Sequence, residues 1–345
     1  MSINLEGAEL RPIEADAYAV LLPEVDRVQV DDGLAAFLSR GGRALVLTLG
    51  DDDGDCRHEE GASAVRRFCA GVSVAADAAV IVAVDTESVG VQGFTHILPA
   101  TPTSERAAHL TDVELAGIFQ NFAEEARRLG VTMFLGPVVD MVTGTNPWLD
   151  GHLLTDDFTR TASTGALYVQ AVQRAGIAAA AKYFPGHSDL PRHPARGRAT
   201  LAVDQDEVVR NLQPFRHLIE ERVRAIVLGP VTATAIDPSS PAATSKVLVD
   251  LLRRELGFRG LIISDQLNLP STTLGRNLGE VARAAIAAGV QLLRIPDAED
   301  VNLIAAALAQ SVHEGRLSRS QLARAADAVR ATAGALRREP LSPTA

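Results

Sequence analysis

The chain has few cysteines, few aromatic residues and almost no lysine. Its 345 residues include two cysteines, one tryptophan and 4% aromatic residues. Cys56 and Cys69 show no metal-ligand spacing, and so low a count suits a reducing compartment. With so few aromatic side chains, the core must consist mostly of Ala, Val, Leu and Ile. We expect neither a metal nor a cofactor.

Positive charge and long apolar runs are also scarce. The net charge is −10, which argues against a nucleic-acid partner, because such partners require a basic face. No apolar stretch approaches the roughly 18 residues of a membrane span. The first twelve residues lack the basic start and apolar run of a signal peptide. We therefore expect a cytoplasmic protein with a small-molecule substrate, no membrane contact and an unknown oligomeric state.

What the chain does contain is a repeated alternation of apolar runs and helical patterns. The runs are continuous rather than alternating, which is typical of strands buried on both faces of a parallel sheet. An eighth strand is expected within the first 40 residues. The seven predicted strands are residues 44–49, 79–85, 131–139, 177–182, 225–229, 261–265 and 290–295.

The helices between these runs carry their own start and stop signals. Thr111 and Glu114 form a capping-box pattern, and Gly130 ends that helix. Ser245 can cap a second helix, with Val247, Leu248 and later leucines facing inward and Gly257 at its end. Two more helices are expected at residues 298–313 and 318–337.

Strand–helix repetition over this length predicts an α/β fold, a TIM-type (β/α)8 barrel of one domain. No glycine-rich dinucleotide fingerprint follows an early strand, which disfavours a Rossmann fold. The domain should span residues 1–337, with residues 338–345 as a disordered tail.

The segment 181–187, AKYFPGH, follows a predicted strand and contains Lys182. Only two of the 33 basic residues are lysines, Lys182 and Lys246. A chain that uses arginine almost everywhere can keep a lysine where a compact ammonium is required. The alternative is that Lys182 survives by chance in a surface loop.

Carboxylates end three of the predicted strands, where a barrel carries its chemistry. Asp265 follows residues 261–264 and is placed to act as a nucleophile or base. Asp85 and Asp140 end two other strands and could bind ligand hydroxyl groups. For each of them, a role as a helix or loop cap is the alternative.

The loop from residue 187 to 198 concentrates polar groups. His193 is a candidate general acid/base, and Asp189 could orient its imidazole. The arginines at 192, 196 and 198 could bind an anion such as phosphate or carboxylate. A solvated loop without a role is the alternative. A Ser–His–Asp hydrolase is disfavoured, because no Gly-x-Ser-x-Gly turn is present.

Together these segments resemble glycoside hydrolase family 3, in its single-domain β-N-acetylglucosaminidase branch. Residues 182–187 are similar to its K-H-F-P-G-H motif, with Tyr183 in place of the first histidine and His187 retained. Residues 256–265 resemble L-G-F-x-G-hydrophobic-S-D, which places Asp265 at the catalytic nucleophile. The resemblance implies a retaining glycosidase with an Asp–His acid/base pair on a mobile loop.

The chain departs from that branch at its substrate-contact motifs. Gly90 and His152 stand where the branch has arginines, and residues 229–231 (GPV) replace A-H-V. The D-S-H element is absent, and Asp189 with His193 is the nearest substitute. Substrate contacts are then expected from the following residues: Asp85, Asp140, His152, Lys182, Tyr183 and His187.

Three functions fit this pattern. The first is a retaining β-glycosidase related to β-N-acetylhexosaminidases, with Asp265 as nucleophile, a loop histidine as acid/base and altered substrate specificity. The second is a glycosyl or acyl transferase or phosphorylase in a biosynthetic pathway, which an anionic substrate and the loop arginines would suit. The third is a non-catalytic sugar-binding protein.

Overall fold

The computed structural model describes residues 12–49, 58–86, 97–149, 151–155 and 157–338. Eight parallel strands form one sheet in the order β10-β1-β2-β3-β4-β5-β7-β9. A parallel bridge between Ile263 and Leu292 joins the two outer strands and closes the barrel. This confirms the predicted α/β TIM-type fold. Its strands are β1 Leu21–Val25, β2 Ala44–Leu47, β3 Ile81–Val84, β4 Met133–Phe134, β5 Ala178–Phe184, β7 Ala225–Leu228, β9 Leu261–Ser264 and β10 Leu293–Ile295.

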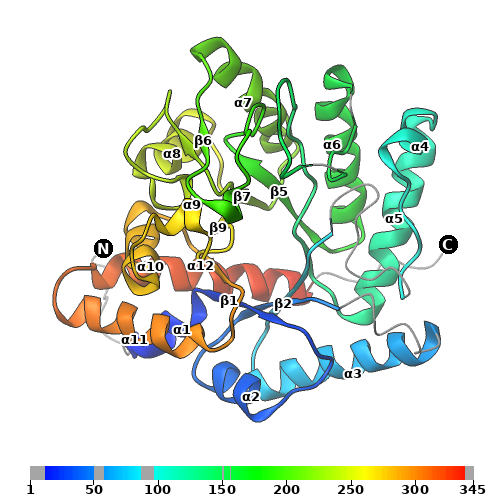
Figure 1. Cartoon of the computed structure of the whole chain (residues 1–345). Coiled ribbons are helices and arrows are strands. Elements are labelled where there is room, and N and C mark those ends of the chain that lie inside the picture. Colours follow the sequence, from blue (N-terminus) through cyan, green and yellow to red (C-terminus); the bar gives the residue numbers. More distant parts are fainter. Residues whose placement is uncertain (1–11, 50–57, 87–96, 150, 156, 339–345) are drawn as a thin grey trace, which may run out of the picture.

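Helices surround these strands (Figure 1). A separate pair of strands, β6 Thr200–Leu201 and β8 Thr232–Ala233, lies outside the barrel sheet. The helices are α1 Ile13–Ala19, α2 Asp32–Ser39, α3 His58–Ala76, α4 Ser104–Ala108, α5 Asp112–Leu129, α6 Phe158–Arg174, α7 Gln205–Glu220, α8 Lys246–Asp250, α9 Pro270–Thr273, α10 Leu278–Ala288, α11 Asp300–His313 and α12 Arg319–Arg338.

Each predicted strand is present, and the sequence explains why. Along β2, Ala44 and Val46 belong to the cluster inside the barrel, whereas Leu45 and Leu47 pack under the helices. The same alternation holds along β3 and β7. Successive side chains of a strand point to opposite faces, so a strand covered on both faces needs a continuous apolar run.

The helix signals are confirmed with one correction. The Thr111–Glu114 capping box is formed, and Gly130 ends α5 with a φ of 99°. Ser245 caps α8, but the chain continues as a π-helical turn, residues 251–255, before Gly257. The prediction that Val247 faces inward is wrong, since 51% of its surface is exposed. It lies on the first turn, where only Leu248 of that pair reaches the core.

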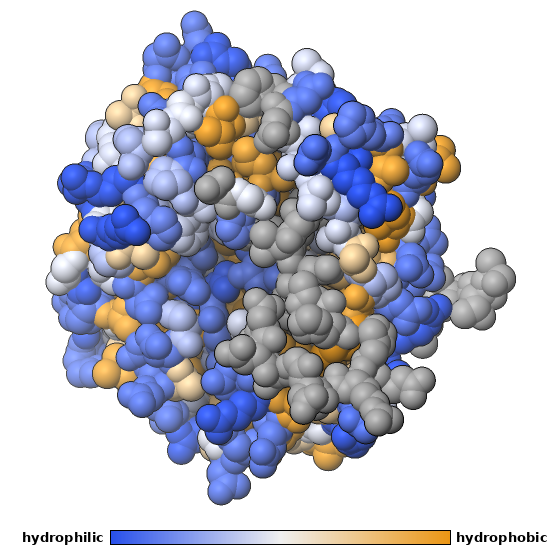
Figure 2. Space-filling view, turned by 45° about the vertical axis from the view of Figure 1, so that its right-hand side comes forward, coloured by the Kyte–Doolittle hydropathy of each residue, from blue (hydrophilic) through white to orange (hydrophobic). Residues whose placement is uncertain are grey.

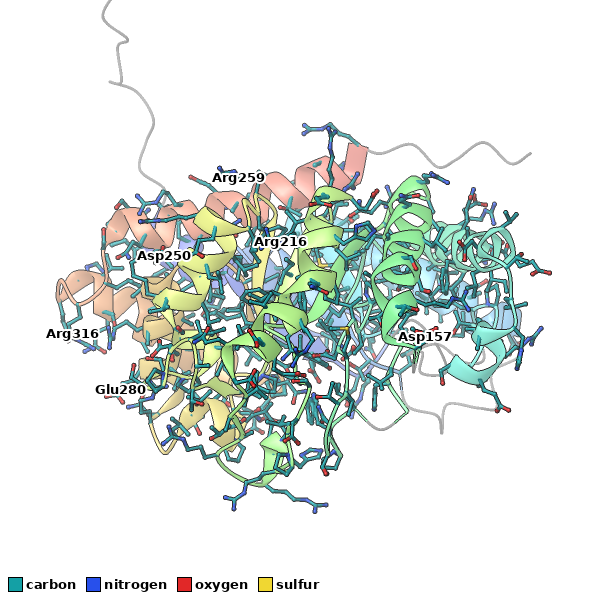
Figure 3. The ribbon with its side chains drawn as sticks, turned by 90° about the horizontal axis from the view of Figure 1, so that it is seen from above. Asp157, Arg216, Asp250, Arg259, Glu280 and Arg316 are labelled. Carbon is teal, nitrogen blue, oxygen red and sulfur yellow. The ribbon has the colours of Figure 1, made fainter. Side chains whose placement is uncertain are left out.

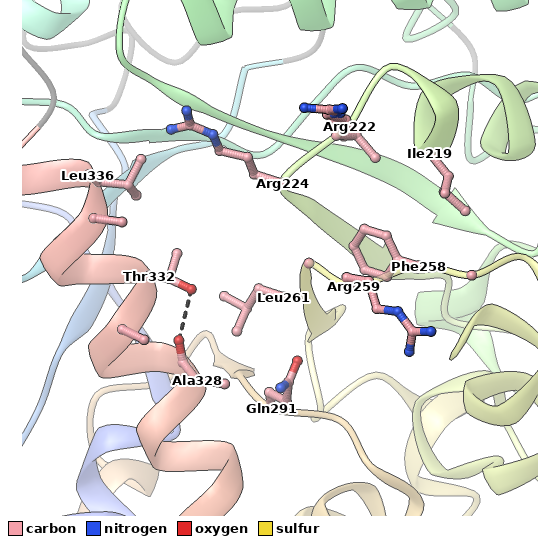
Figure 4. Close-up of a pocket in the computed structure, with 15 residues that line it drawn as sticks. Ile219, Arg222, Arg224, Phe258, Arg259, Leu261, Gln291, Ala328, Thr332 and Leu336 are labelled. Atoms are coloured by element: carbon pink, nitrogen blue, oxygen red, sulfur yellow. Dashed lines mark hydrogen bonds between the residues drawn. The ribbon is translucent and has the colours of Figure 1, made fainter. Parts of the chain in front are cut away.

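Helix α12 closes the amino-terminal end of the barrel. Val329, Ala333 and Leu336 pack in the interior cluster with Ala44 and Ile81, which begin their strands. A cavity of about 640 Å³ remains there between α12 and the residues before β7 and β9 (Figure 4). Apart from this cavity, α12 covers the amino-terminal end of the barrel, which leaves the carboxyl ends of the strands for chemistry.

The described surface is mostly polar. Hydrophilic residues predominate on the face in Figure 2, and apolar ones are scattered in small groups. Charged side chains such as Arg216, Asp250, Arg259 and Glu280 lie around the periphery in Figure 3. Among the described helices, none is both long enough and apolar enough to cross a bilayer. Arg338, the first residue of the predicted tail, still belongs to α12. The rest of that tail, residues 339–345, and Cys56 lie outside the described residues.

Candidate active site

The inward-facing positions of the strands change from apolar to charged at their carboxyl ends. In β9 the interior residues Leu261 and Ile263 lead, two residues later, to Asp265. In β3 the interior residues Ile81 and Ala83 lead in the same way to Asp85. Because alternate residues share a face, these carboxylates enter the barrel mouth above the apolar layers.

Three more charged residues follow the same rule. Lys182 continues the inward positions of β5, Glu24 those of β1 and Arg294 those of β10. Lys182 and Arg294 both form ion pairs with Asp85, and Arg294 also contacts Glu24. The structure thus brings together Asp85, Lys182 and Asp265, which the sequence analysis names, with Glu24 and Arg294, which it does not name. Reading the inward alternation along β1 and β10 would have found both.

Asp265 is the least accessible carboxylate of this group, with 4% of its surface exposed. Its Oδ1 accepts a hydrogen bond of 2.8 Å from the backbone N–H of Gln266 and lies 3.7 Å from a guanidinium nitrogen of Arg294. Its buried Oδ2 has no hydrogen-bond partner among the described residues. Burial raises the pKa of Asp265, and the positive charges of Arg294 and Lys182 partly oppose that rise.

Asp85 has the opposite electrostatic balance. Burial by itself would raise its pKa, but Lys182 and Arg294 hold the pKa well below its ordinary value. Asp85 is therefore a permanent carboxylate, and 30% of its side chain remains exposed. The two carboxylates thus differ in environment, one constantly ionised and one costly to ionise, which is how sites assign different roles to like groups.

Asp140 anchors the bend that follows β5. Its Oδ1 accepts a hydrogen bond of 2.6 Å from the N–H of His187, and its Oδ2 accepts one of 3.2 Å from the N–H of Tyr183. Asn146 donates to the carbonyl of His187 at 2.6 Å. The peptide bonds Lys182–Tyr183 and Phe184–Pro185 are cis. These contacts define a structural part for Asp140, and its substrate contact stays a prediction.

An aromatic group extends from the ion pairs toward the loop. The Tyr183 ring lies 5.2 Å from the Lys182 ammonium and stacks on His187 with ring centroids 5.4 Å apart. Trp148 contacts Tyr183 on one side and His193 on the other, at 6.1 Å and 4.9 Å between ring centroids. Trp148 was missed, although the chain's single tryptophan directly after Asn146 and Pro147 was a signal.

His187 is fully buried, and burial lowers its pKa to about 3. The ring is therefore neutral at ordinary pH and does not titrate there. A Cβ on Gly229 would lie 2.1 Å from its Nε2, so the glycine makes room for the imidazole. This explains why a residue without a side chain starts the segment 229–231.

His193 and Asp189 make separate contacts. The Nδ1 of His193 accepts a hydrogen bond of 3.2 Å from the N–H of Ala195 and caps the short helix η1, Pro194–Arg196. The neutral ring then carries its proton on Nε2. Asp189 accepts one of 3.0 Å from the N–H of Thr145. No hydrogen bond between His193 and Asp189 occurs in the described chain, and their pairing stays a prediction.

His152 is half-buried, and its backbone N–H donates to the carbonyl of Leu149 at 3.0 Å. Its role in binding substrate stays a prediction. The site as a whole is a barrel mouth with one buried nucleophile candidate, one ionised acceptor, two buried cations and an aromatic wall. Such a constellation is typical of carboxylate-dependent enzymes of the α/β-barrel class.

The comparisons with known proteins identify the family. Residues 47–331 match the glycosyl hydrolase family 3 N-terminal domain, and the chain belongs to this family. A β-hexosaminidase of Nitrosomonas eutropha is 29% identical over 308 residues, which cover 84% of this chain and 83% of that protein. The predicted family and its glycoside hydrolase class of enzyme are thereby confirmed.

Solved structures show the same fold. A family 3 β-N-acetylglucosaminidase from Paenibacillus has a TM-score of 0.85 at 22% identity, and the match covers 96% of this chain but 64% of that one. A β-N-acetylhexosaminidase from Beutenbergia cavernae has a TM-score of 0.83 at 20% identity and is covered over 98% of its length, with 93% of this chain.

Proposed function

We propose that this protein is a retaining β-glycosidase that removes a terminal β-linked amino sugar, with Asp265 as its nucleophile. The observation that carries this proposal is the Oδ2 of Asp265, which has no partner among the described residues while a backbone N–H fixes Oδ1 at the barrel mouth. The names of the β-hexosaminidase relatives support the amino-sugar class.

In this mechanism the Oδ2 lone pair attacks the anomeric carbon and forms a covalent glycosyl-enzyme as the aglycone oxygen leaves. Asp85 accepts hydrogen bonds from ring hydroxyls, because it stays ionised. His193 acts as the acid in its imidazolium form, in which Nδ1 no longer accepts from Ala195. Nε2 gives a proton to the leaving oxygen, and the resulting neutral imidazole then takes one from the attacking water. Trp148 holds the imidazole and offers the sugar a flat apolar surface.

The test is release of the aryl group from an aryl N-acetyl-β-glucosaminide. We expect Asp265→Ala to reduce turnover by at least about 10³-fold, since removing a reacting group leaves only residual catalysis. Asp112→Ala is the matched control, because its side chain is 69% exposed on the first turn of α5. Turnover that survives in Asp265→Ala would refute the nucleophile assignment.

A glycosyl phosphorylase is the second candidate. It is favoured by the arginines at 192, 196 and 198, which lie on the same loop as His193. A neutral imidazole tolerates an incoming phosphate better than a carboxylate acid/base would, because like charges repel. Product release that requires inorganic phosphate would select this candidate over hydrolysis. We also propose an anionic substrate, which these arginines would suit, and a cytoplasmic location.

A further inference from the structure

One guanidinium joins three carboxylates at the barrel mouth. The Nε of Arg294 lies 2.7 Å from Oε1 of Glu24, and a terminal nitrogen lies 2.8 Å from Oδ2 of Asp85. The second terminal nitrogen lies 3.7 Å from Oδ1 of Asp265. All the nitrogens of the fork therefore face acidic groups, each supplied by a different strand end.

The arrangement is built rather than incidental. The Arg294 side chain is 7% exposed, and Ser264 Oγ accepts a hydrogen bond of 3.1 Å from its backbone N–H. Glu24, its anchor on β1, also accepts a bond of 3.0 Å from Gln266 Nε2, next to the nucleophile. A buried arginine without partners would be costly, so its hydrogen bonds to Glu24 and Asp85 and its ion pair with Asp265 indicate a fixed position.

Arg294 holds two carboxylates at once, Glu24 through Nε and Asp85 through a terminal nitrogen. Lys182 cannot take over this task, because its ammonium is a point charge, whereas the planar fork can hold two carboxylates at a fixed spacing.

We propose that Arg294, anchored by Glu24, is a positioning residue that fixes Asp85 for sugar binding and keeps the nucleophile Asp265 in its reactive charged form. This proposal rests on the glycosidase function above. Asp265 is faced by Arg294 from β10, Lys182 from β5 and Asp85 after β3, with Glu24 of β1 behind Arg294. Without the guanidinium, only Lys182 compensates the negative charges of Asp85 and Glu24 near the nucleophile.

Arg294 sets the pH at which kcat/KM falls on the acid side. Asp265 attacks only when deprotonated, so kcat/KM falls on the acid side as pH drops through the pKa of Asp265. Arg294 lowers that pKa against burial. Arg294→Leu should therefore move the acid limb to higher pH. It should also reduce kcat/KM by about 100-fold at neutral pH, because displaced catalytic groups cost roughly that much.

Two further variants separate charge from geometry. Arg294→Lys keeps a cation and should leave the acid limb near its original pH, but it should raise KM because Asp85 and Glu24 are no longer held together. Glu24→Gln removes a negative charge and should move the acid limb to lower pH. Opposite shifts in Arg294→Leu and Glu24→Gln are the signature of the proposal, and a purely structural role would shift neither limb.

A second measurement does not depend on turnover. The free energy of unfolding is compared across pH between the protein and its Asp265→Asn variant, and the comparison is repeated with Arg294→Leu added to both. A raised folded pKa makes the protein with Asp265 lose stability relative to Asp265→Asn as pH rises from the unfolded pKa to the folded one. That window should extend to higher pH when Arg294→Leu is present.

The two proposals fail in different ways. If wild-type turnover is absent, the proposed function fails, while the pH window of the Asp265→Asn comparison still decides the part of Arg294. A window that Arg294→Leu leaves unchanged would overturn the positioning role, whether or not the protein hydrolyses the aryl glycoside.

Discussion

Lys182 occupies a space that suits an ammonium and little else. The side chain is fully buried, pairs with Asp85 and lies against the Tyr183 ring. Extra atoms in a packed interior force neighbours out of their rotamers. The lysine at this position thus has a local physical reason in a chain that otherwise uses arginine almost everywhere.

We expect Lys182→Arg to destabilise the protein by about 1–3 kcal/mol through overpacking, despite the unchanged charge. Lys246→Arg is the matched control, because it changes the only other lysine, which is 64% exposed on α8 and should alter stability by less than about 0.5 kcal/mol. Urea unfolding measures both. Equal effects of the two substitutions would show that the space around Lys182 accommodates a guanidinium.

Much of the fold could be predicted at the level of elements, and less of the site. The apolar runs predicted the strands because a strand that is buried on both faces has apolar residues at successive positions. Asp265, Asp85 and Lys182 were found because each lies at the end of a run. Arg294 lies inside the run of β10, so only the inward alternation of that strand marks its position. Its pairing with Glu24 and Asp85, which are far away in sequence, could not be predicted, because contacts between distant elements leave no local pattern.

Gly229, directly after β7, lies close against the bend that follows β5. Gly229→Ala places a methyl group 2.1 Å from Nε2 of His187 and 3.1 Å from Cβ of Tyr183. Since both rings are buried, we expect a loss of about 1–3 kcal/mol in stability and a displaced Tyr183.

The control for this substitution is Gly117→Ala in α5, where a Cβ would meet nothing within 4 Å. Alanine favours a helix over glycine, so this variant should gain up to about 1 kcal/mol. Thermal unfolding compares the two. A Gly229→Ala protein as stable as wild type, with unaltered turnover, would mean that His187 can move without consequence.

At the scale of the whole molecule, the first and last helices are joined by a buried ion cluster. Asp16 of α1 is 2% exposed and contacts Arg319 and Arg330 of α12, the latter at 2.6 Å. Arg330 also donates to the carbonyl of Ala15 at 3.1 Å. The helix that closes the barrel is thereby attached to the helix that precedes β1.

Asp16→Ala should cost about 3 kcal/mol, because it removes the buried carboxylate that Arg319 and Arg330 both contact. Asp26→Ala removes a pair with Arg27 in which both side chains are more than 80% exposed, and it should cost less than about 1 kcal/mol. Guanidinium unfolding separates these values. A small loss for Asp16→Ala would show that solvent replaces the carboxylate.

Because α12 covers the amino-terminal end of the barrel, it limits the side from which the site can be reached. Apolar side chains fill the barrel axis, and Val329, Ala333 and Leu336 stop its lower end. Among the described residues, the carboxyl ends of the strands are then the side by which substrate and water would enter and products would leave. In a two-step hydrolysis the aglycone has to depart before water can approach the covalent intermediate by the same route. Departure of the first product thus becomes a timing step for the second, and a tightly held aglycone would act as its own inhibitor.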